Sequence, residues 1–165
     1  MEIRRLLRHL FATRIGTRLR FSDAVDSDIE TAIRAAESRT SGEIRFVIET
    51  ALDAPELWAE LTPRERAAQV FAEFRVWDTE LRNGVLIYVL AADRDVEIVA
   101  DRAASAVVAL AGWEQAARTM EEHFREGRFR EGAVAGVAAV AGLLEAHFPA
   151  RAVERNELTN QPSLL

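Results

Sequence analysis

Residues 83–100 read NGVLIYVLAADRDVEIVA, and this stretch decides the fold. Asn83-Gly84 is a turn signal, and the continuously apolar run Val85–Leu90 is typical of a central strand buried on both faces. Ala92–Asp95 is a tight connection that leads into a second strand-like run, Val96–Ala100. The stretch therefore predicts an antiparallel hairpin.

A further strand is predicted upstream of this hairpin. Glu43–Thr50 (EIRFVIET) alternates apolar and polar residues, and a helix with a capping box and an early proline follows at residues 62–75. A strand, a helix and a strand predict a right-handed parallel crossover. Other helices are predicted at residues 1–13, 23–38, 101–110, 112–126 and 131–147. We expect an α/β fold, a three-layer α/β/α sandwich around a small mixed sheet.

Length and composition narrow the class of protein. The chain has 165 residues, a net charge of −6 and no cysteine. Its length suits one domain, and the absence of cysteine excludes disulfides, thiol catalysis and cysteine-bound zinc. The acidic body argues against broad nucleic-acid binding. We expect a basic amphipathic segment at residues 1–21, the domain at 22–149 and a polar, flexible tail at 150–165.

The N-terminal segment does not have the pattern of a secretory signal. Met1–Arg20 carries charge throughout and lacks a continuous apolar centre. The most apolar run, Gly132–Leu144, is too short to span a bilayer. We therefore expect a cytoplasmic protein, peripheral to the inner face of the membrane if it contacts a membrane at all.

Four short stretches follow one another along the chain in a recognisable order. They are Thr40-Ser41-Gly42-Glu43-Ile44, similar to T-G-x-E before a strand; Asn83-Gly84-Val85-Leu86, similar to N-G-V-L; Asp93-Arg94, similar to a D-D-R hairpin; and Phe124–Gly136, similar to F-R-x-G-x-[YF]-x-x-G-x-x-x-G. By their order and spacing, these four stretches resemble the TPM domain family.

The resemblance implies several functions and points to one branch of the family. Family members have been described as phosphatases and calcium binders, and others act in the assembly or repair of membrane complexes. Ala100-Asp101-Arg102 stands where many members have glycine-tyrosine-glycine, so the phosphatase function does not transfer freely. The run Thr79–Leu86 (TELRNGVL) is similar to the shorter, cytosolic branch.

Oxygen-bearing side chains are expected to meet at one edge of the sheet. If the two crossover strands are parallel, Glu43 and Asn83 share an edge, and the antiparallel third strand returns Asp101 to it, with Asp78 in the preceding loop. Carboxylate and amide oxygens are the ligands that Ca²⁺ and Mg²⁺ prefer. The alternative is that Asp101 caps its helix and Glu43 pairs with an arginine.

Asp93, Arg94 and Asp95 lie at the opposite edge and form a secondary candidate site. An Asp-x-Asp sequence after an apolar strand is similar to the start of aspartyl-phosphatase sites, which also need Mg²⁺. The alternative is a hairpin turn, in which aspartate is favoured because it forms local hydrogen bonds.

Basic residues of the N-terminal helix, Arg4, Arg5 and Arg8, lie beside apolar ones and can rest on an anionic membrane surface. The alternative is that this helix packs on the domain through Leu6, Leu10 and Phe11.

These features lead to two hypotheses. The first is a TPM-like accessory or interaction module that binds a divalent cation, Ca²⁺ or Mg²⁺, and serves a membrane-linked partner. The second is a metal-dependent phosphatase at the Glu43 edge. Its anion clamp would come from Arg45, Arg82 and Arg102.

Overall fold

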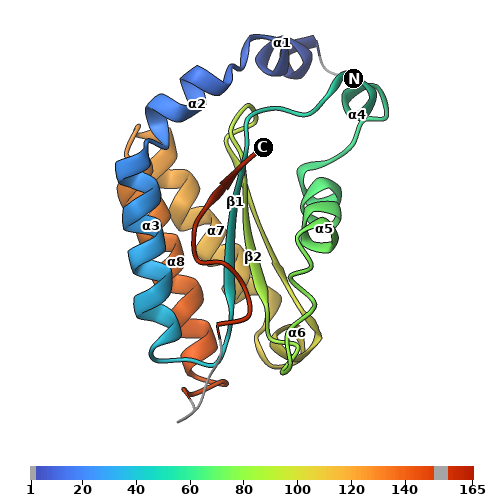
Figure 1. Ribbon diagram of the computed structural model, residues 1–165. Helices are drawn as coiled ribbons and strands as arrows, with labels where there is room; N and C mark the ends of the chain where they lie inside the picture. Colours follow the sequence, from blue (N-terminus) through green and yellow to red (C-terminus); the bar gives the residue numbers. More distant parts are fainter. Residues whose placement is uncertain (1–2, 151–155) are drawn as a thin grey trace.

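Within residues 3–150 and 156–165, which the computed structural model describes, four strands form one sheet in the order β3-β2-β1-β4 (Figure 1). The strands β1 (Ile44–Glu49) and β2 (Val85–Leu90) are parallel, and β3 (Asp95–Ala100) runs antiparallel to β2. The predicted crossover and hairpin are both confirmed.

Helices cover both faces of the sheet, which confirms the three-layer sandwich (Figure 1). One face packs against α3 (Asp23–Glu37), α7 (Leu110–Arg125) and α8 (Phe129–Glu145). The other face packs against α4 (Ala54–Trp58) and α5 (Pro63–Glu73). None of the helices in the described part of the chain is long and apolar enough to cross a membrane.

Local sequence signals set several helix starts. Thr62 and Glu65 form a capping box at the start of α5, each side chain accepting from the backbone amide of the other residue. Asp101 caps the short helix α6 (Arg102–Val107), and its Oδ1 accepts from the Arg102 amide at 2.7 Å. Both caps lie at positions that the sequence predicts.

The N-terminal segment forms two helices, whereas the sequence pattern predicted only one there, at residues 1–13. They are α1 (Ile3–Phe11) and α2 (Arg14–Arg20). The second helix begins because Thr13 acts as its cap, with Oγ1 accepting from the Gly16 amide at 3.1 Å. The first two residues lie outside the described residues.

The C-terminal tail was expected to be loose, and for residues 156–165 this was wrong. These residues run along the sheet, where β4 (Ser163–Leu164) pairs in parallel with β1. The Leu165 amide donates to the carbonyl of Ile48 at 2.8 Å. The preceding five residues of the predicted tail lie outside the described residues.

Candidate functional site

The structure brings the starts of β1 and β2 and the end of β3 to one edge, which we call the rim. Ile44 and Ala100 both align with Val85, so β1 and β3, the two neighbours of β2, are about 10 Å apart at this level. The Val85 amide donates to the Glu43 carbonyl at 2.8 Å, and the Asp101 amide donates to the Gly84 carbonyl at 2.9 Å. The rim therefore has the predicted backbone arrangement.

Three of the four predicted rim side chains are buried, and each has a structural partner. Glu43 accepts from the Leu158 amide at 3.1 Å, and the Asn83 amide group donates to the carbonyl of Ser41 at 2.7 Å. Asp101, the third, is the α6 cap described above. Asp78 is half-exposed and pairs with Arg75 at 3.2 Å.

Two oxygen atoms at the rim keep free acceptor capacity. Asn83 Oδ1 and Asp101 Oδ2 are buried, and neither accepts a hydrogen bond within the described residues. The described residues nevertheless contain no group of three histidine, cysteine, aspartate or glutamate side chains placed to hold a metal ion. The Ca²⁺ or Mg²⁺ site with Glu43 and Asp78 as ligands stays a prediction.

Glu37, at the end of α3, is a rim residue that sequence reasoning missed. Its carboxylate accepts from the Ile44 amide at 3.2 Å and from the side chain of Asn160 at 2.5 Å. Burial, together with the nearby charge of Glu43, raises the pKa of Glu37 to about 7. Its position in an acidic, polar helix resembles a solvated face, so no local signal marks it.

Arg45 does not serve as the anion clamp that the phosphatase hypothesis assigned to it. Its buried guanidinium donates to the carbonyls of Thr159 at 2.9 Å and Gln161 at 2.5 Å, and to the hydroxyl of Ser163. It also lies 5.0 Å from the ring centre of Phe74. These contacts hold the tail on β1 and use three of the N–H donors of the buried guanidinium.

At the opposite edge, the turn after β2 holds the N-terminal helix on the domain. Arg5 and Arg8 donate to the two carboxylate oxygens of Asp93 at 2.9 and 2.8 Å, and His9 Nε2 lies 3.2 Å from Oδ2. Burial alone would raise the pKa of Asp93, but the bonds from Arg5 and the contact with His9 bring it below its ordinary value. His9 Nδ1 also accepts from the Leu52 amide at 2.9 Å.

The hairpin candidates therefore separate into different environments. Asp93 and Arg94 lie in the turn, and Asp95 begins β3. Burial raises the pKa of Asp95 to about 6, with further contributions from Glu97 and Glu121. Because both carboxylate oxygens of Asp93 accept hydrogen bonds from arginines of α1, this side chain is not placed to act as a nucleophile.

The helices α1 and α2 each have an inward and an outward face. Arg5, Leu6 and His9 face the domain, and Arg5 also donates to the Leu61 carbonyl at 2.8 Å. Leu10 and Phe11, which pack on the domain in the alternative to membrane contact, are instead exposed. The outward apolar face comprises Ile3, Leu7, Leu10, Phe11, Ile15 and Leu19, with exposed fractions of 73, 45, 71, 75, 75 and 81%.

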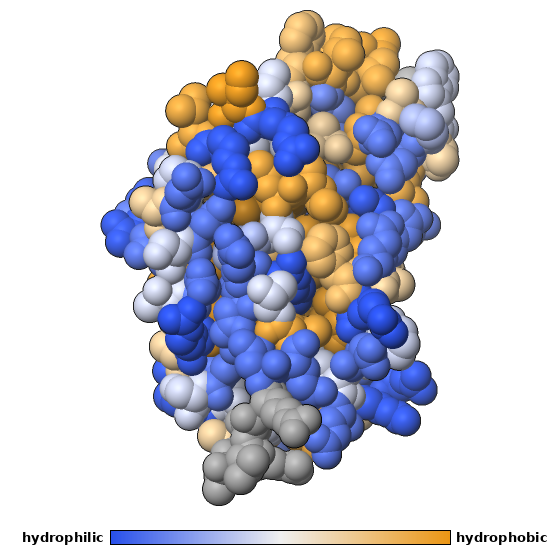
Figure 2. All heavy atoms as spheres, viewed as in Figure 1, coloured by the Kyte–Doolittle hydropathy of each residue, from blue (hydrophilic) through white to orange (hydrophobic). Residues whose placement is uncertain are grey.

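This outward apolar face lies at one end of the molecule. Figure 2 shows apolar side chains gathered over the end formed by α1 and α2. Arg4 is exposed beside it, and Arg8 is half-exposed although it contacts Asp93. Of the three arginines expected at a membrane surface, Arg5 is turned toward the domain and used for docking α1.

Comparisons with known proteins agree with this fold. Residues 19–143 match the TPM domain. The solution structure of the BA42 protein from the psychrophilic bacterium Bizionia argentinensis is similar, with 31% identity over 87% of this chain and 94% of that one and a TM-score of 0.77. The N-terminal domain of a P. gingivalis protein shares the fold, with 20% identity over 77% of this chain and 78% of that one and a TM-score of 0.58. No protein of curated function matches. The chain belongs to the TPM domain family.

Proposed function

We propose that this TPM domain is an accessory module that docks on an anionic membrane surface through α1 and α2. The observation that carries the proposal is the outward apolar face, six large side chains exposed on two short helices. Large apolar side chains gathered on one side of two neighbouring helices mark an interaction site, whereas single exposed apolar residues are ordinary.

The side chains of this face are exposed while α1 and α2 are folded and held on the domain. Asp93 and His9 anchor α1 on the turn after β2, and Leu6 packs against the core beneath α4 and α5. In α2 the buried Thr17 faces inward, opposite Leu19. The two helices therefore present their apolar side chains outward while being held from behind.

Charge favours an anionic occupant over a neutral one. Residues 3–20 contain six of the 21 arginines and none of the 27 acidic residues, so the rest of the chain carries a net −12. Each arginine near an anionic membrane contributes about 1 kcal/mol to binding. A basic helix with an outward apolar face is the form that lies in the membrane interface.

Sedimentation with vesicles tests the docking. We expect the protein to sediment with vesicles containing phosphatidylglycerol and to remain in solution with neutral vesicles. The double variant Leu10→Glu/Leu19→Glu removes two exposed side chains whose burial in the membrane would contribute about 1.5 kcal/mol each, so its partition should fall about a hundredfold. The control Leu110→Glu changes an exposed leucine on α7, outside this face, and should sediment like the wild type.

Other outcomes would identify a different occupant. If wild-type protein ignores anionic vesicles, or if the double variant and the control sediment alike, the proposal is wrong. If the wild type dimerises in solution and the double variant does not, the face binds a second copy of the chain.

A second candidate function, binding of a divalent cation at the rim, is favoured by the two buried acceptor oxygens there. Asn83 Oδ1 and Asp101 Oδ2 lack donors within the described residues, and such oxygens suit Ca²⁺. Calorimetric titration with Ca²⁺ tests this. We expect heat from the wild type and a loss of it in Asp101→Asn, whose Oδ1 can still cap α6. Absence of heat and of thermal stabilisation at millimolar Ca²⁺ would exclude the site.

A further inference from the structure

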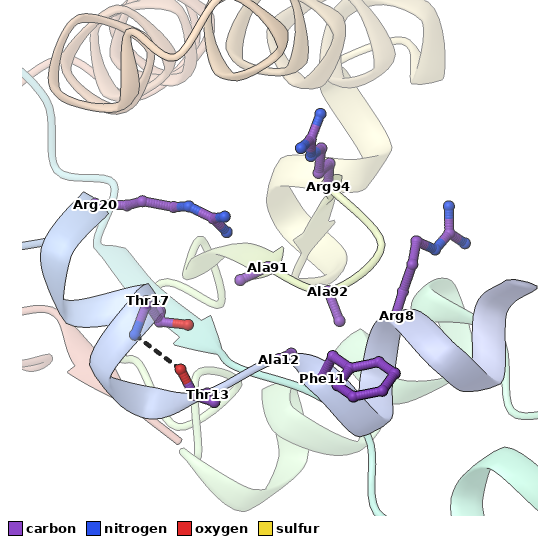
Figure 3. Close-up of a pocket in the computed structure, with 10 residues that line it drawn as sticks. Arg8, Phe11, Ala12, Thr13, Thr17, Arg20, Ala91, Ala92 and Arg94 are labelled. Carbon is purple, nitrogen blue, oxygen red and sulfur yellow. Dashed lines mark hydrogen bonds between the residues drawn. The ribbon is translucent and has the colours of Figure 1, made fainter.

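A pocket of about 380 Å³ lies between the N-terminal helices and the turn after β2, a size suited to a small molecule. Figure 3 shows that its arginine side chains come from three separate segments around the backbone of Ala91 and Ala92. Arg8 belongs to α1, Arg20 to the end of α2 and Arg94 to the turn.

The charge of this pocket is one-sided. Three arginines line it, and none of its lining residues is acidic. Arg8 contacts Asp93 through Nη2, whereas neither Arg20 nor Arg94 forms an ion pair within residues 3–150 and 156–165. Arg20 is held in place by the Phe129 ring, 5.5 Å from its guanidinium carbon. In a chain of net charge −6, arginines without an ion-pair partner that line one pocket favour the binding of an anion there.

The remaining walls suit an organic phosphate. The planar guanidinium group offers paired N–H donors that match phosphate oxygens. Thr13 Oγ1 accepts from the Gly16 amide, which leaves the hydroxyl hydrogen able to donate into the pocket. Phe11, Ala12 and Ala92 supply an apolar wall.

We propose that this pocket binds a phosphate monoester, with Arg20 and Arg94 as its principal ligands. The group can be carried by a small soluble molecule or by a lipid headgroup, since the pocket adjoins the outward apolar face. Binding of a soluble phosphate requires no membrane, so this inference stands apart from the proposed docking function.

Titration of the protein with inorganic phosphate and with glycerol 3-phosphate, followed by NMR, tests the pocket. We expect saturable shifts of the amides of Ala91, Ala92 and Gly16. Arg20→Gln and Arg94→Gln should each weaken binding about tenfold or more, because each removes charge-assisted hydrogen bonds. The control Arg18→Gln changes an arginine of α2 that does not line the pocket and pairs with Asp26, and it should bind like the wild type.

Vesicle binding separates the two sources of the phosphate. Vesicles with phosphatidic acid carry a phosphate monoester, and vesicles with phosphatidylglycerol of equal charge do not. Preference for phosphatidic acid that is lost in Arg94→Gln assigns the pocket to a lipid headgroup, and saturable binding of the soluble probes without that preference assigns it to a soluble ligand.

The pocket proposal is overturned if inorganic phosphate, glycerol 3-phosphate and phosphatidic acid all fail to bind specifically, or if Arg18→Gln lowers binding as much as Arg94→Gln. The variant Leu10→Glu/Leu19→Glu should keep soluble phosphate binding even where vesicle docking is lost.

Discussion

The substitution Asp93→Asn keeps the shape of the side chain and removes the negative charge that Arg5 and Arg8 share. The Asp93 side chain is 8% exposed and that of Arg5 is 20% exposed, so this pair is largely removed from water. Arg8 is 54% exposed, and water can replace most of its contact. The loss therefore concentrates on the Arg5 contact and on the docking of α1.

The size of this loss follows from burial. Removing one partner of a fully buried ion pair costs about 3–5 kcal/mol. The pair is partly hydrated, and asparagine keeps one acceptor oxygen, so about 2 kcal/mol is expected, or about thirtyfold in the docking equilibrium of α1. Because the pKa of Asp93 lies below its ordinary value, the aspartate contribution is complete at neutral pH and is lost only as the pH falls below about 4.

Native-state hydrogen exchange measures this docking directly. The amides of α1 should exchange about thirtyfold faster in Asp93→Asn, while those of β1 and β2 keep their rates. The control Asp78→Asn removes an exposed pair with Arg75 and should leave α1 unchanged. Unchanged α1 exchange in Asp93→Asn would refute the anchoring role, and equal acceleration in β2 would show that α1 is not a separate unit.

Three further predictions concern stability. Gly84→Ala should lower the melting temperature, at a cost of about 1–3 kcal/mol, because the added Cβ would lie 2.1 Å from a backbone carbonyl oxygen. Its control, Gly142→Ala inside α8, adds a Cβ in open space and should stabilise the protein by about 0.5–1 kcal/mol. Glu37, with a pKa raised to about 7, binds more protons folded than unfolded between about pH 4.5 and 7, so chemical denaturation should show stability falling as pH rises through that window. Glu37→Gln should remove the Glu37 share of this fall and leave the part below about pH 6 that comes from Asp95. Deletion of residues 156–165 removes the acceptors of Arg45 and should lower the free energy of unfolding by about 3 kcal/mol. In the truncated protein, Arg45→Met should restore part of this loss because it removes the unpaired buried cation. An equal loss in the truncated proteins with Arg45 and with Met at this position would contradict this role of Arg45.

The central sheet was predictable because its strands carry strong local patterns. Val85–Leu90 is continuously apolar and is buried on both faces, as such a run requires. The crossover followed from the order of elements alone. The packing partner of Gly132 and Gly136 was not predictable from such a pattern: they face α7, where a Cβ on Gly136 would lie 2.1 Å from the Met120 sulfur.

The rim was predictable in its backbone and less so in its side chains. Parallel strands bring their starts together whatever the side chains are, so Glu43 and Asn83 had to share an edge with Asp101. The bond that occupies Glu43 comes from the amide of Leu158, which is more than a hundred positions away. The buried Glu37 belongs to the same tail network through Asn160.

The N-terminal helix shows why counting apolar residues was misleading. Leu6 packs inward, but the other inward contacts are polar and are made with distant residues such as Asp93, which is more than eighty positions away. A buried ion pair frees Leu10 and Phe11 from the core, so they can face outward. The β4 pairing was likewise invisible, because two residues form no pattern and the pairing depends on the distant Arg45.

The sheet places the two proposed surfaces at opposite ends of its strands. The rim lies at the starts of β1 and β2, whereas the turn that anchors α1 follows the end of β2. The strands β1 and β2 each have six residues and therefore span about 20 Å. This exceeds the screening length of about 8 Å at physiological ionic strength, so a membrane bound at α1 and α2 exerts little electrostatic influence on a cation at the rim. The docked domain would then present the rim away from the lipid, where a protein partner can reach it.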